Sequence, residues 1–499
     1  MRWLSGWRAA VVVSAAGLAT AAAQYALTGS PATAARALPA GALAAAVALL
    51  ALTLPGLTVR GVIVGGFFVL AGAVSWTYLD RGWVVWGLLA VEGVVFAVWS
   101  WPWLRPLPAL VRLGSAWLGL AYWLLGIVGA LLATYLSNHL RVAGERLLYA
   151  GVFTLAALAV ISGVRTGGRG RPGRDLSVGV AAAFLLAIAA LLLTGSGNLF
   201  AAVHVVPGGV WGKNMEHRFW GGQWLLYHPN SLALVAVVSA IRIGADRAFG
   251  SHTRLAVTVL AGFIVYETNS RTGFVYFGAA AVLHGYLLWR HRERLPSYRR
   301  PWLAAAVPFI ALALVLVCSH GEGFLFQSRY PDAGMTSGRT DTWKAVGVEW
   351  LHAGWPEKLL GDAHTTRAVV KRDNDGAAEG EKHLQLTTDN AAVGALRRGG
   401  VLGELAFLVG LALLLQHAVR GPRTQAGTVR GPGTVRRAPP AWFTLAAVGS
   451  LPTIATADWL LGGTGGTLWI LLLAGEAWLL LGTHDAADHP TGRPAATGA

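Results

Sequence analysis

Long apolar runs separated by short polar segments make up most of the chain. Runs of about 17 to 23 residues match the length of helix that crosses the hydrocarbon core of a bilayer. The pattern therefore predicts about fourteen transmembrane helices. We expect them near residues 9–27, 36–57, 61–79, 83–100, 114–136, 147–164, 177–195, 224–241, 254–268, 273–289, 302–318, 400–418, 442–461 and 466–482.

One long polar segment, residues 320–399, interrupts this pattern. It holds eleven of the 24 acidic residues of the chain. Helical spacing of its apolar residues predicts short helices that lie at the membrane interface. Its centre, from Gly361 to Lys382, is rich in turn residues, and we expect a lid or an acceptor-binding surface there.

Composition agrees with a membrane protein. Hydrophobic residues make up 55% of the chain and charged residues only 13%, about half of the charged fraction of a soluble domain. The net charge of +16 does not indicate nucleic-acid binding, because the basic residues lie mostly in short loops between apolar runs. The predicted fold is an all-α polytopic membrane protein with one long extracytoplasmic loop.

The distribution of basic residues predicts the orientation. With the N-terminus inside, 23 basic residues fall in inner segments and seven in short outer loops. Such an excess marks the cytoplasmic side. We therefore expect a multi-pass protein of the cytoplasmic membrane, with both termini cytoplasmic and the long loop outside. An uncleaved first helix is preferred to a signal peptide, although Arg2 and Arg8 would suit either.

This topology divides the chain into consecutive parts. Seven helices come first, and four more helices with an outer loop follow. The long loop comes next. The last three helices then carry an Arg/Gly/Pro-rich linker that we expect to be flexible, and a tail ends the chain. Cys318, the single cysteine, excludes an intrachain disulfide. The parts are residues 1–195, 196–318, 319–399, 400–482 with the linker 420–440, and 483–499.

Two polar motifs lie beside the predicted outer ends of helices. Residues 228–233, HPNSLA, open one helix, with His228 and Asn230 placed to line a cavity and Arg218 in the loop before them. Ser270 and Arg271 lie in a tight hairpin, where a guanidinium is suited to bind phosphate through two hydrogen bonds. For the first motif the alternative is an ordinary interfacial loop. For the second it is an arginine whose side chain only extends towards the lipid headgroups.

Two further motifs begin and end the long loop. A helix is expected after Arg339, with Thr340 or Asp341 as its N-cap; the arginine at its positive end either binds an anion or only faces lipid headgroups. The segment 388–400, TDNAAVGALRRGG, predicts a short helix that ends at Gly399 and Gly400. Asp389 is either a catalytic group or a simple helix cap.

Arginines beside a carboxylate or imidazole suit one reaction in particular. Arginines neutralise a departing pyrophosphate, while the carboxylate or imidazole takes the proton of an attacking sugar hydroxyl. We expect no metal and no cofactor. Asp373, Asp375 and Glu379 are close enough in sequence to bind a divalent ion, but a solvated acidic loop is the preferred interpretation.

These four motifs, in this order, resemble those of the O-antigen ligase and O-antigen polymerase family of membrane glycosyltransferases. The resemblance covers roughly residues 200 to 420. It implies a metal-independent, inverting transferase that moves a glycan from a polyprenyl-diphosphate carrier to a glycan or lipid acceptor on the outer face of the membrane.

The resemblance also implies roles for individual residues. Arg271 and Arg339 would bind the diphosphate, with Arg218 as a third ligand. Where ligases of this family carry a His-Asn pair, this chain has Asp389 and Asn390. That departure favours a polymerase or a relative over a lipid A-core ligase, and it leaves Asp389 or His383 as the base.

Two other functions remain open. A flippase for lipid-linked oligosaccharides suits the number of helices. It would need charges through the membrane core, however, and the predicted spans carry few, of which Glu92, Asp458, Glu404 and Glu476 are the acidic ones. A glycosyltransferase of another fold, using a lipid-phosphate sugar, would carry acidic residues in its first outer loop, and this chain has none there.

Overall fold

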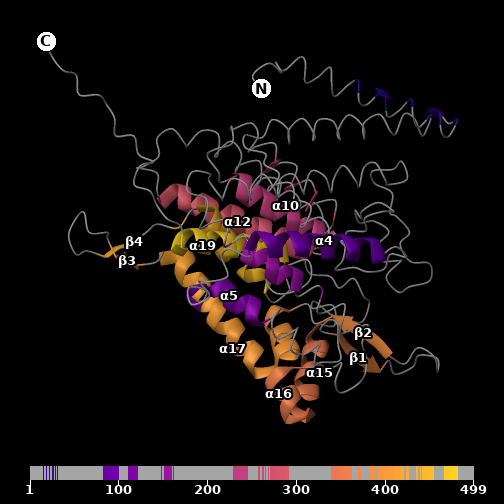
Figure 1. The fold of residues 1–499 in the computed structure, drawn as a ribbon, viewed down its shortest axis with the longest axis vertical. Coiled ribbons are helices and arrows are strands. Elements are labelled where there is room, and N and C mark those ends of the chain that lie inside the picture. The colour runs from indigo at the N-terminus through magenta and orange to yellow at the C-terminus, as the bar shows by residue number, and fades with distance from the viewer. Residues whose placement is uncertain are drawn as a thin grey trace.

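The computed structural model describes helices and strands spread along the chain (Figure 1). It describes residues 82–100, 111–121, 229–244, 270–290, 339–361, 369–373, 383–387, 390–420, 423–425, 434–436, 439, 441–454 and 466–481, with scattered residues in 15–31, 148–161 and 257–268. This part is predominantly helical, as the sequence predicts.

Several predicted helices are observed within a few residues of their expected bounds. These are α4 (Gly82–Ser100), α12 (Arg271–Arg290) and α19 (Gly466–Leu481). Helix α10 (Pro229–Gly244) begins at its proline, which is tolerated in a first helical turn. Uninterrupted apolar stretches define these helices well.

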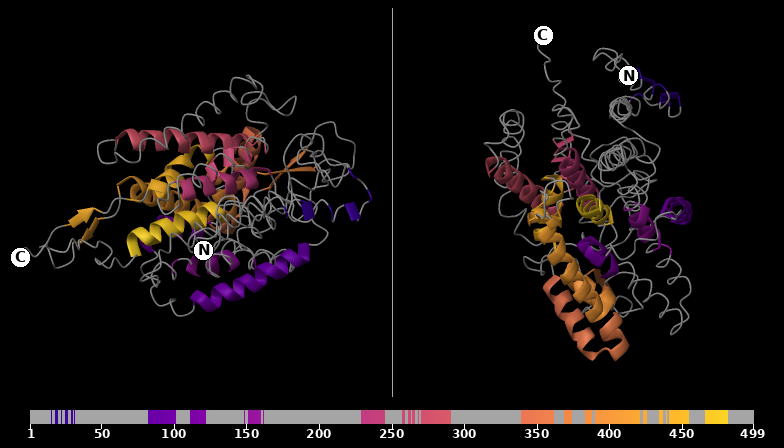
Figure 2. Two further views of the ribbon diagram at one scale, coloured as in Figure 1. Left: turned by 90° about the horizontal axis from the view of Figure 1, so that it is seen from above. Right: turned by 60° about the vertical axis from the view of Figure 1, so that its left-hand side comes forward.

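The core lies where α10, α12 and α19 pack against one another and against α18 (Ala441–Gly449) (Figures 1 and 2). Tyr276 of α12 is fully buried there, and its hydroxyl donates to the carbonyl of Ala446 at 3.1 Å. Phe443 on α18 is also fully buried. Buried aromatic side chains of this size contribute much of the apolar contact between helices.

The prediction of one continuous helix over 442–461 is wrong. Helix α18 (Ala441–Gly449) ends early, and a 3₁₀ turn, η6 (Leu451–Thr453), follows it. Pro452 is the cause, because a proline nitrogen cannot donate the hydrogen bond that would continue the α-helix. The hydroxyls of Ser450 and Thr453 donate to the carbonyls of Ala447 and Ser450 instead.

Helix α17 (Ala391–Arg420) consists of two segments. Gly400 separates them with φ 59° and ψ −154°, a conformation that is open essentially to glycine alone. The short helix predicted to end at Gly399 and Gly400 is therefore present as the first segment, 391–399. The second segment, 401–420, runs from this kink past the short helix α5 (Gly114–Gly119).

Helices α15 (Arg339–His352) and α16 (Trp355–Leu360) lie at the lower end of the molecule in Figure 1, beside the kink of α17. A Cβ on Gly361, where φ is 84°, would lie 2.2 Å from the carbonyl carbon of Arg398, and a Cβ on Gly400 would lie 2.4 Å from that of Leu359. The two glycines thus allow backbone-to-backbone packing of α16 on the kink.

Two short antiparallel ribbons occur where the sequence predicts only loops. Strand β1 (Val369–Asp373) pairs with β2 (His383–Thr387), so that Val369 lies opposite Thr387 and Asp373 opposite His383. Strand β3 (Arg423–Gln425) pairs with β4 (Thr434–Arg436) in the Arg/Gly/Pro-rich segment. The backbone hydrogen bonds of each ribbon order segments that turn-rich composition suggests are irregular.

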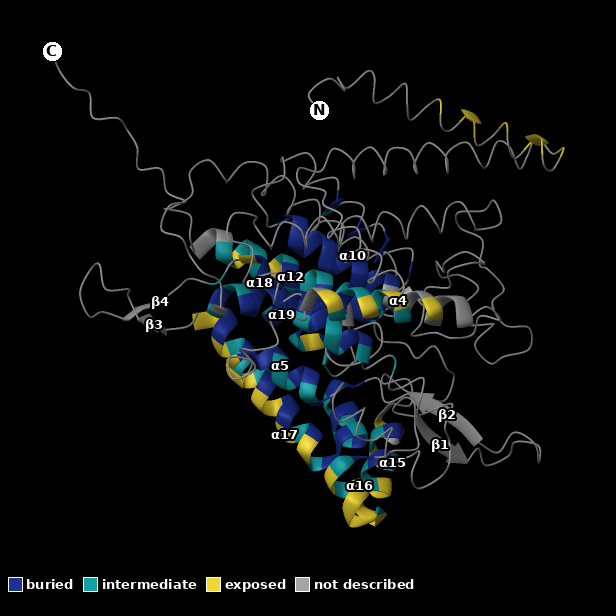
Figure 3. Cartoon of the chain, in the orientation of Figure 1, coloured by how far each residue is buried: buried dark blue, intermediate teal, exposed yellow. Residues whose placement is uncertain are grey.

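Exposed positions form stripes along some helices (Figure 3), and several of these positions carry large apolar side chains. On α4 they are Val91, Val94 and Val98, and on α17 they include Leu402, Leu405, Leu408 and Val419. Among the described residues, α17 alone is long and apolar enough to cross a membrane by length and composition, and 39% of its most apolar window is buried. Shorter apolar helices cover Leu232–Gly244 and Leu468–Leu480.

Candidate functional site

The two motifs that begin α10 and α12 meet directly. The hydroxyl of Ser270 donates to Oδ1 of Asn230 at 2.9 Å, and the backbone N–H of Gly273 donates to the same hydroxyl at 3.2 Å. Ser270 therefore caps α12 while joining it to the first turn of α10. Residues 40 positions apart form one polar junction.

Gly273 explains how closely these helices approach. A Cβ at this position would lie 2.8 Å from the Cβ of Ala233 on α10. Gly273, the last residue of the segment 270–273 (SRTG), is thus needed for packing. It places the first residue of α12, Arg271, beside the start of α10. Because both helices begin here, their N-terminal dipoles add a partial positive charge beside the first residue of α12, Arg271.

The N-terminus of α17 is held in the core by its own cap and by α18. Oδ1 of Asn390 accepts hydrogen bonds from the backbone N–H groups of Ala392 at 3.0 Å and Val393 at 3.1 Å. The N–H of Ala391 donates to the carbonyl of Ile454 at 2.9 Å, directly after η6, which packs against α12. The end of the polar segment thus enters the helical core near α12 before it leaves along α17.

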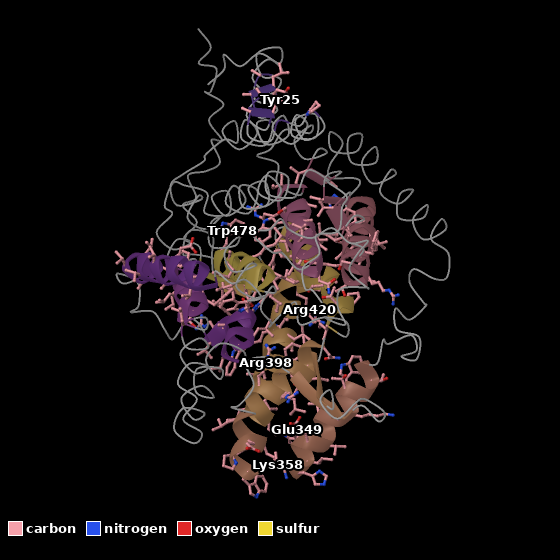
Figure 4. All side chains as sticks on the ribbon, turned by 90° about the vertical axis from the view of Figure 1, so that its right-hand side faces the viewer. Tyr25, Glu349, Lys358, Arg398, Arg420 and Trp478 are labelled. Atoms are coloured by element: carbon pink, nitrogen blue, oxygen red, sulfur yellow. The ribbon has the colours of Figure 1, made fainter. Side chains whose placement is uncertain are left out.

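Helix α15 begins at Arg339, so the prediction of Thr340 or Asp341 as its N-cap is wrong, and both residues lie within the first turn. It is tied to α17 by an ion pair in which Nη2 of Arg397 lies 3.3 Å from Oε2 of Glu349. Arg397 is 6% exposed. Figure 4 shows Glu349 on α15 near Arg398 of α17. The ion pair fixes the helix that begins with Arg339 against the segment that begins with Asn390.

A second polar cluster lies where α5, α17 and α19 meet. The carboxylate of Glu476 on α19 is fully buried. Its oxygens accept hydrogen bonds from the backbone N–H groups of Gly114 at 2.7 Å and Ser115 at 2.8 Å, and from the hydroxyl of Ser115. Glu476 therefore supplies, from a distant helix, the negative group that the N-terminus of α5 favours.

His417 of α17 completes this cluster. Its Nδ1 lies 2.6 Å from Oε1 of Glu476, and because a carboxylate only accepts, Nδ1 carries the hydrogen. The indole N–H of Trp469 donates to the carbonyl of Ser115 at 2.7 Å. A Cβ on Gly114 would lie 2.4 Å from the carbonyl oxygen of Gly410, so α5 and α17 also meet backbone to backbone.

The predicted site residues fall into three groups in the structure. Asn230 and Ser270 are in contact, with Arg271 next in the chain, and Asn390 caps α17, whose first residue is bound to Ile454. Arg339 and His383 are placed only by their backbones, at the start of α15 and at the start of β2. Arg218, His228 and Asp389 lie outside the described residues.

Sequence reasoning missed Arg397, Arg398 and the partners of Glu476. Two arginines directly before a Gly-Gly pair, inside a motif already singled out, are a signal that could have found the first two. The pairing of Glu476 with residues 361 and 362 positions away has no local signal. Among the described residues, no group of His, Cys, Asp and Glu is arranged to hold a metal ion.

The junction of α10 and α12 is suited to bind an anion. It combines two helix N-termini with an arginine, Arg271, as the first residue of α12, and the side chains that are hydrogen-bonded there, the Ser270 hydroxyl and the Asn230 amide, are neutral. An oxyanion at this place would gain from the fixed cation and from the aligned backbone dipoles. Comparisons with protein-family models, with curated proteins and with solved structures found no match.

Proposed function

We propose that the chain is a polytopic membrane glycosyltransferase that moves a glycan from a polyprenyl-diphosphate carrier to an acceptor glycan or lipid on the outer face of the cytoplasmic membrane. The observation that carries this proposal is the hydrogen bond between Ser270 and Asn230. It joins two of the four motifs behind the resemblance to the O-antigen ligase and polymerase family, with Arg271 at their junction.

The distribution of apolar side chains supports a membrane environment. Val94 of α4 is 65% exposed, Val282 of α12 68% and Val419 of α17 64%. Each belongs to a stripe of exposed apolar residues on one helix face. Contiguous exposed apolar surface is rare in soluble monomers, whereas lipid covers such stripes without cost.

The proposed orientation is supported by which residues meet. The alternation of spans predicts that Gly114, His417 and Glu476 all lie at inner ends, and these residues are in contact. It also predicts inner positions for Arg242 and Trp442, and the guanidinium carbon of Arg242 lies 4.5 Å from the centre of the Trp442 ring. Asn230 and Ser270, at predicted outer ends, meet each other.

The proposed reaction needs little from the protein beyond charge and position. The acceptor hydroxyl attacks the anomeric carbon from the face opposite the diphosphate, the bond from that carbon to the diphosphate oxygen breaks, and polyprenyl diphosphate leaves. Arg271, Arg339 and Arg218 would bind the diphosphate and stabilise its developing charge. Asp389 or His383 would take the proton of the hydroxyl.

The first test is a transfer assay with the full chain in proteoliposomes that contain a polyprenyl-diphosphate-linked glycan and an acceptor glycan. We expect a transferred or elongated product that requires no added metal. Arg271→Ala should lower its rate about 100-fold or more, as the loss of a group that stabilises developing negative charge does. Arg271→Lys should restore only part, because it loses the bidentate geometry.

Folding must be separated from chemistry in this assay. Arg420, exposed at the end of α17, provides the matched control, since Arg420→Ala removes the same charge and should leave the rate unchanged. Wild-type rates in both Arg271→Ala and Arg339→Ala would refute the proposal. Loss on Asp389→Asn but not on His383→Ala would assign the base to Asp389, and the reverse result would assign it to His383.

A flippase remains the second candidate, but no described contact favours it. Of the acidic residues within the predicted spans, Glu476 has a structural explanation: its carboxylate caps α5 and binds His417. An acidic group held by four hydrogen-bond donors is fixed in place, whereas transport requires groups that bind and release.

A further inference from the structure

A stripe of exposed apolar residues runs along the second segment of α17. Leu402, Leu405, Leu408 and Val409 are 46%, 53%, 51% and 42% exposed, and Val419 is 64% exposed. From residue 402 to residue 419 the helix rises roughly 26 Å, close to the thickness of a bilayer's hydrocarbon core. The stripe begins two residues after the kink at Gly400.

Helix α16 is fixed at the end of this stripe. The reciprocal packing of Gly361 on Arg398 and of Gly400 on Leu359 leaves no room for a Cβ at either glycine. The indole N–H of Trp350 on α15 also donates to the carbonyl of Lys358 at 3.3 Å. Helix α16 is therefore held on two sides, and its position relative to α17 is set by backbone contacts.

The outer face of α15 and α16 is also apolar. Trp355 is 76% exposed and Leu359 44% exposed, one helical turn apart on α16, while Val348 and Leu351 of α15 are 55% and 62% exposed. Figure 3 shows the exposed positions of α17 continuing onto α16 at its lower end. Nζ of Lys358 lies 5.8 Å from the centre of the Trp355 ring.

We infer that α16 is an interfacial anchor, with Trp355 and Leu359 inserted at the boundary between the headgroups and acyl chains of the outer leaflet. This inference rests on the proposed membrane location of α17. The occupant is the lipid surface because the patch continues a stripe of bilayer length and lies just past its end. A tryptophan beside a lysine suits this depth, since the indole favours the interface and the ammonium reaches the headgroups.

The anchor has a consequence for the proposed site. Helix α15, which begins at Arg339, is joined to α16 through Trp350 and to α17 through Glu349 and Arg397. An anchored α16 holds this helix at the level of the lipid phosphates. The diphosphate of a polyprenyl carrier lies at the same level, so the anchor sets the height at which Arg339 meets it.

Depth-dependent quenching tests the anchor in the full-length protein. In a Cys318→Ser background, single cysteines replace Trp355, Leu359, Glu357 and Leu408, each labelled with an environment-sensitive fluorophore. The labelled proteins are reconstituted into phosphatidylcholine vesicles whose acyl chains carry a nitroxide either near the glycerol backbone or near the bilayer centre. A soluble quencher reports exposure to water.

The inference predicts a different response at each position. The label at 355 or 359 should emit at shorter wavelength and lose fluorescence mainly with the shallow nitroxide. The label at 408, in the middle of the α17 stripe, should respond mainly to the deep nitroxide. The label at 357, an exposed position on the opposite face of α16, should respond mainly to the soluble quencher.

Three results would overturn the inference. If labels at 355 and 359 respond as the label at 357 does, while the label at 408 is quenched by lipid, the anchor is refuted and the membrane location of α17 stands. If the label at 408 also fails to respond to either lipid nitroxide, the proposed membrane function fails too. Protection of 355 and 359 from all quenchers, with cross-linking between chains, would assign the face to a second copy.

Discussion

The two polar clusters of this protein are built from the same elements but are completed differently. Around Glu476, the N-terminus of α5 is capped by a carboxylate from α19, and His417 and Ser115 use its remaining capacity as an acceptor. At the start of α10 and α12, the hydroxyl of Ser270 caps α12 and donates to the neutral amide of Asn230, and the next residue along the chain is Arg271.

This difference distinguishes the Glu476 cluster, which is a structural contact between helices, from the α10–α12 junction, which is a candidate binding site. A helix N-terminus attracts an anion in both places. In the first cluster the chain supplies that anion itself, so the cluster holds three helices together and offers nothing to a ligand. In the second cluster the two hydrogen-bonded side chains, the Ser270 hydroxyl and the Asn230 amide, are neutral and lie next to the first residue of α12, Arg271, which suits an anion that arrives from outside.

The largest effect on stability is expected at Glu476. Glu476→Ala leaves the buried donors of Gly114, Ser115 and His417 without their acceptor, and each buried donor left unsatisfied costs about 1–3 kcal/mol. The midpoint of thermal unfolding of the detergent-purified protein measures this. Glu357→Ala, at an exposed position on α16, is the control and should leave the midpoint unchanged. An unchanged midpoint in Glu476→Ala would show that the cluster does not join the helices.

A smaller but clear effect is expected at the kink of α17. Gly400→Ala forces a Cβ to within 2.4 Å of the carbonyl carbon of Leu359 at a φ of 59°, and strained backbone alone costs about 1–3 kcal/mol. Gly347→Ala, in α15, meets no atom within 4 Å and should stabilise by about 0.5–1 kcal/mol. Thermal unfolding should therefore move in opposite directions for these two matched changes. Equal shifts would contradict the packing of α16 on the kink.

The smallest effect is expected at Asn390. Asn390→Ala removes the cap of α17 and should cost about 1 kcal/mol, whereas Asn390→Asp keeps an acceptor and should cost less. If the cap only stabilises the helix, transfer activity per folded molecule stays constant across the two variants. If Asn390→Ala loses more activity than folded protein, the N-terminus of α17 belongs to the site.

The sequence was informative where local signals decide the structure. Apolar length defined α4, α12 and α19, and the Gly-Gly pair correctly predicted the break at Gly400. The break after Gly449 was missed because the residues around Pro452 keep the hydropathy high, although a proline one turn past a glycine is itself a signal for a helix end. The ribbon β1–β2 was missed because each strand has only five residues.

The candidate site was predictable as a set of motifs but not as a set of contacts. Helix N-termini and a hairpin arginine can be read from short stretches of sequence. The hydrogen bond between Ser270 and Asn230, and the anchoring of Ala391 on Ile454, depend on how distant helices pack. No local pattern carries that information, and only the alternation of predicted spans suggested which ends share a level.

The most direct test of the central claim compares donor binding at the two clusters. The affinity of the full-length protein in nanodiscs for a polyprenyl-diphosphate-linked glycan should fall about tenfold or more in Arg271→Ala, since a charge-assisted hydrogen bond is worth about 1.5–3 kcal/mol. Glu476→Gln, measured on folded protein below its unfolding temperature, should bind as the wild type does. Equal affinity in Arg271→Ala and wild type, or a loss confined to Glu476→Gln, would contradict the assignment of the α10–α12 junction as the site that binds the diphosphate.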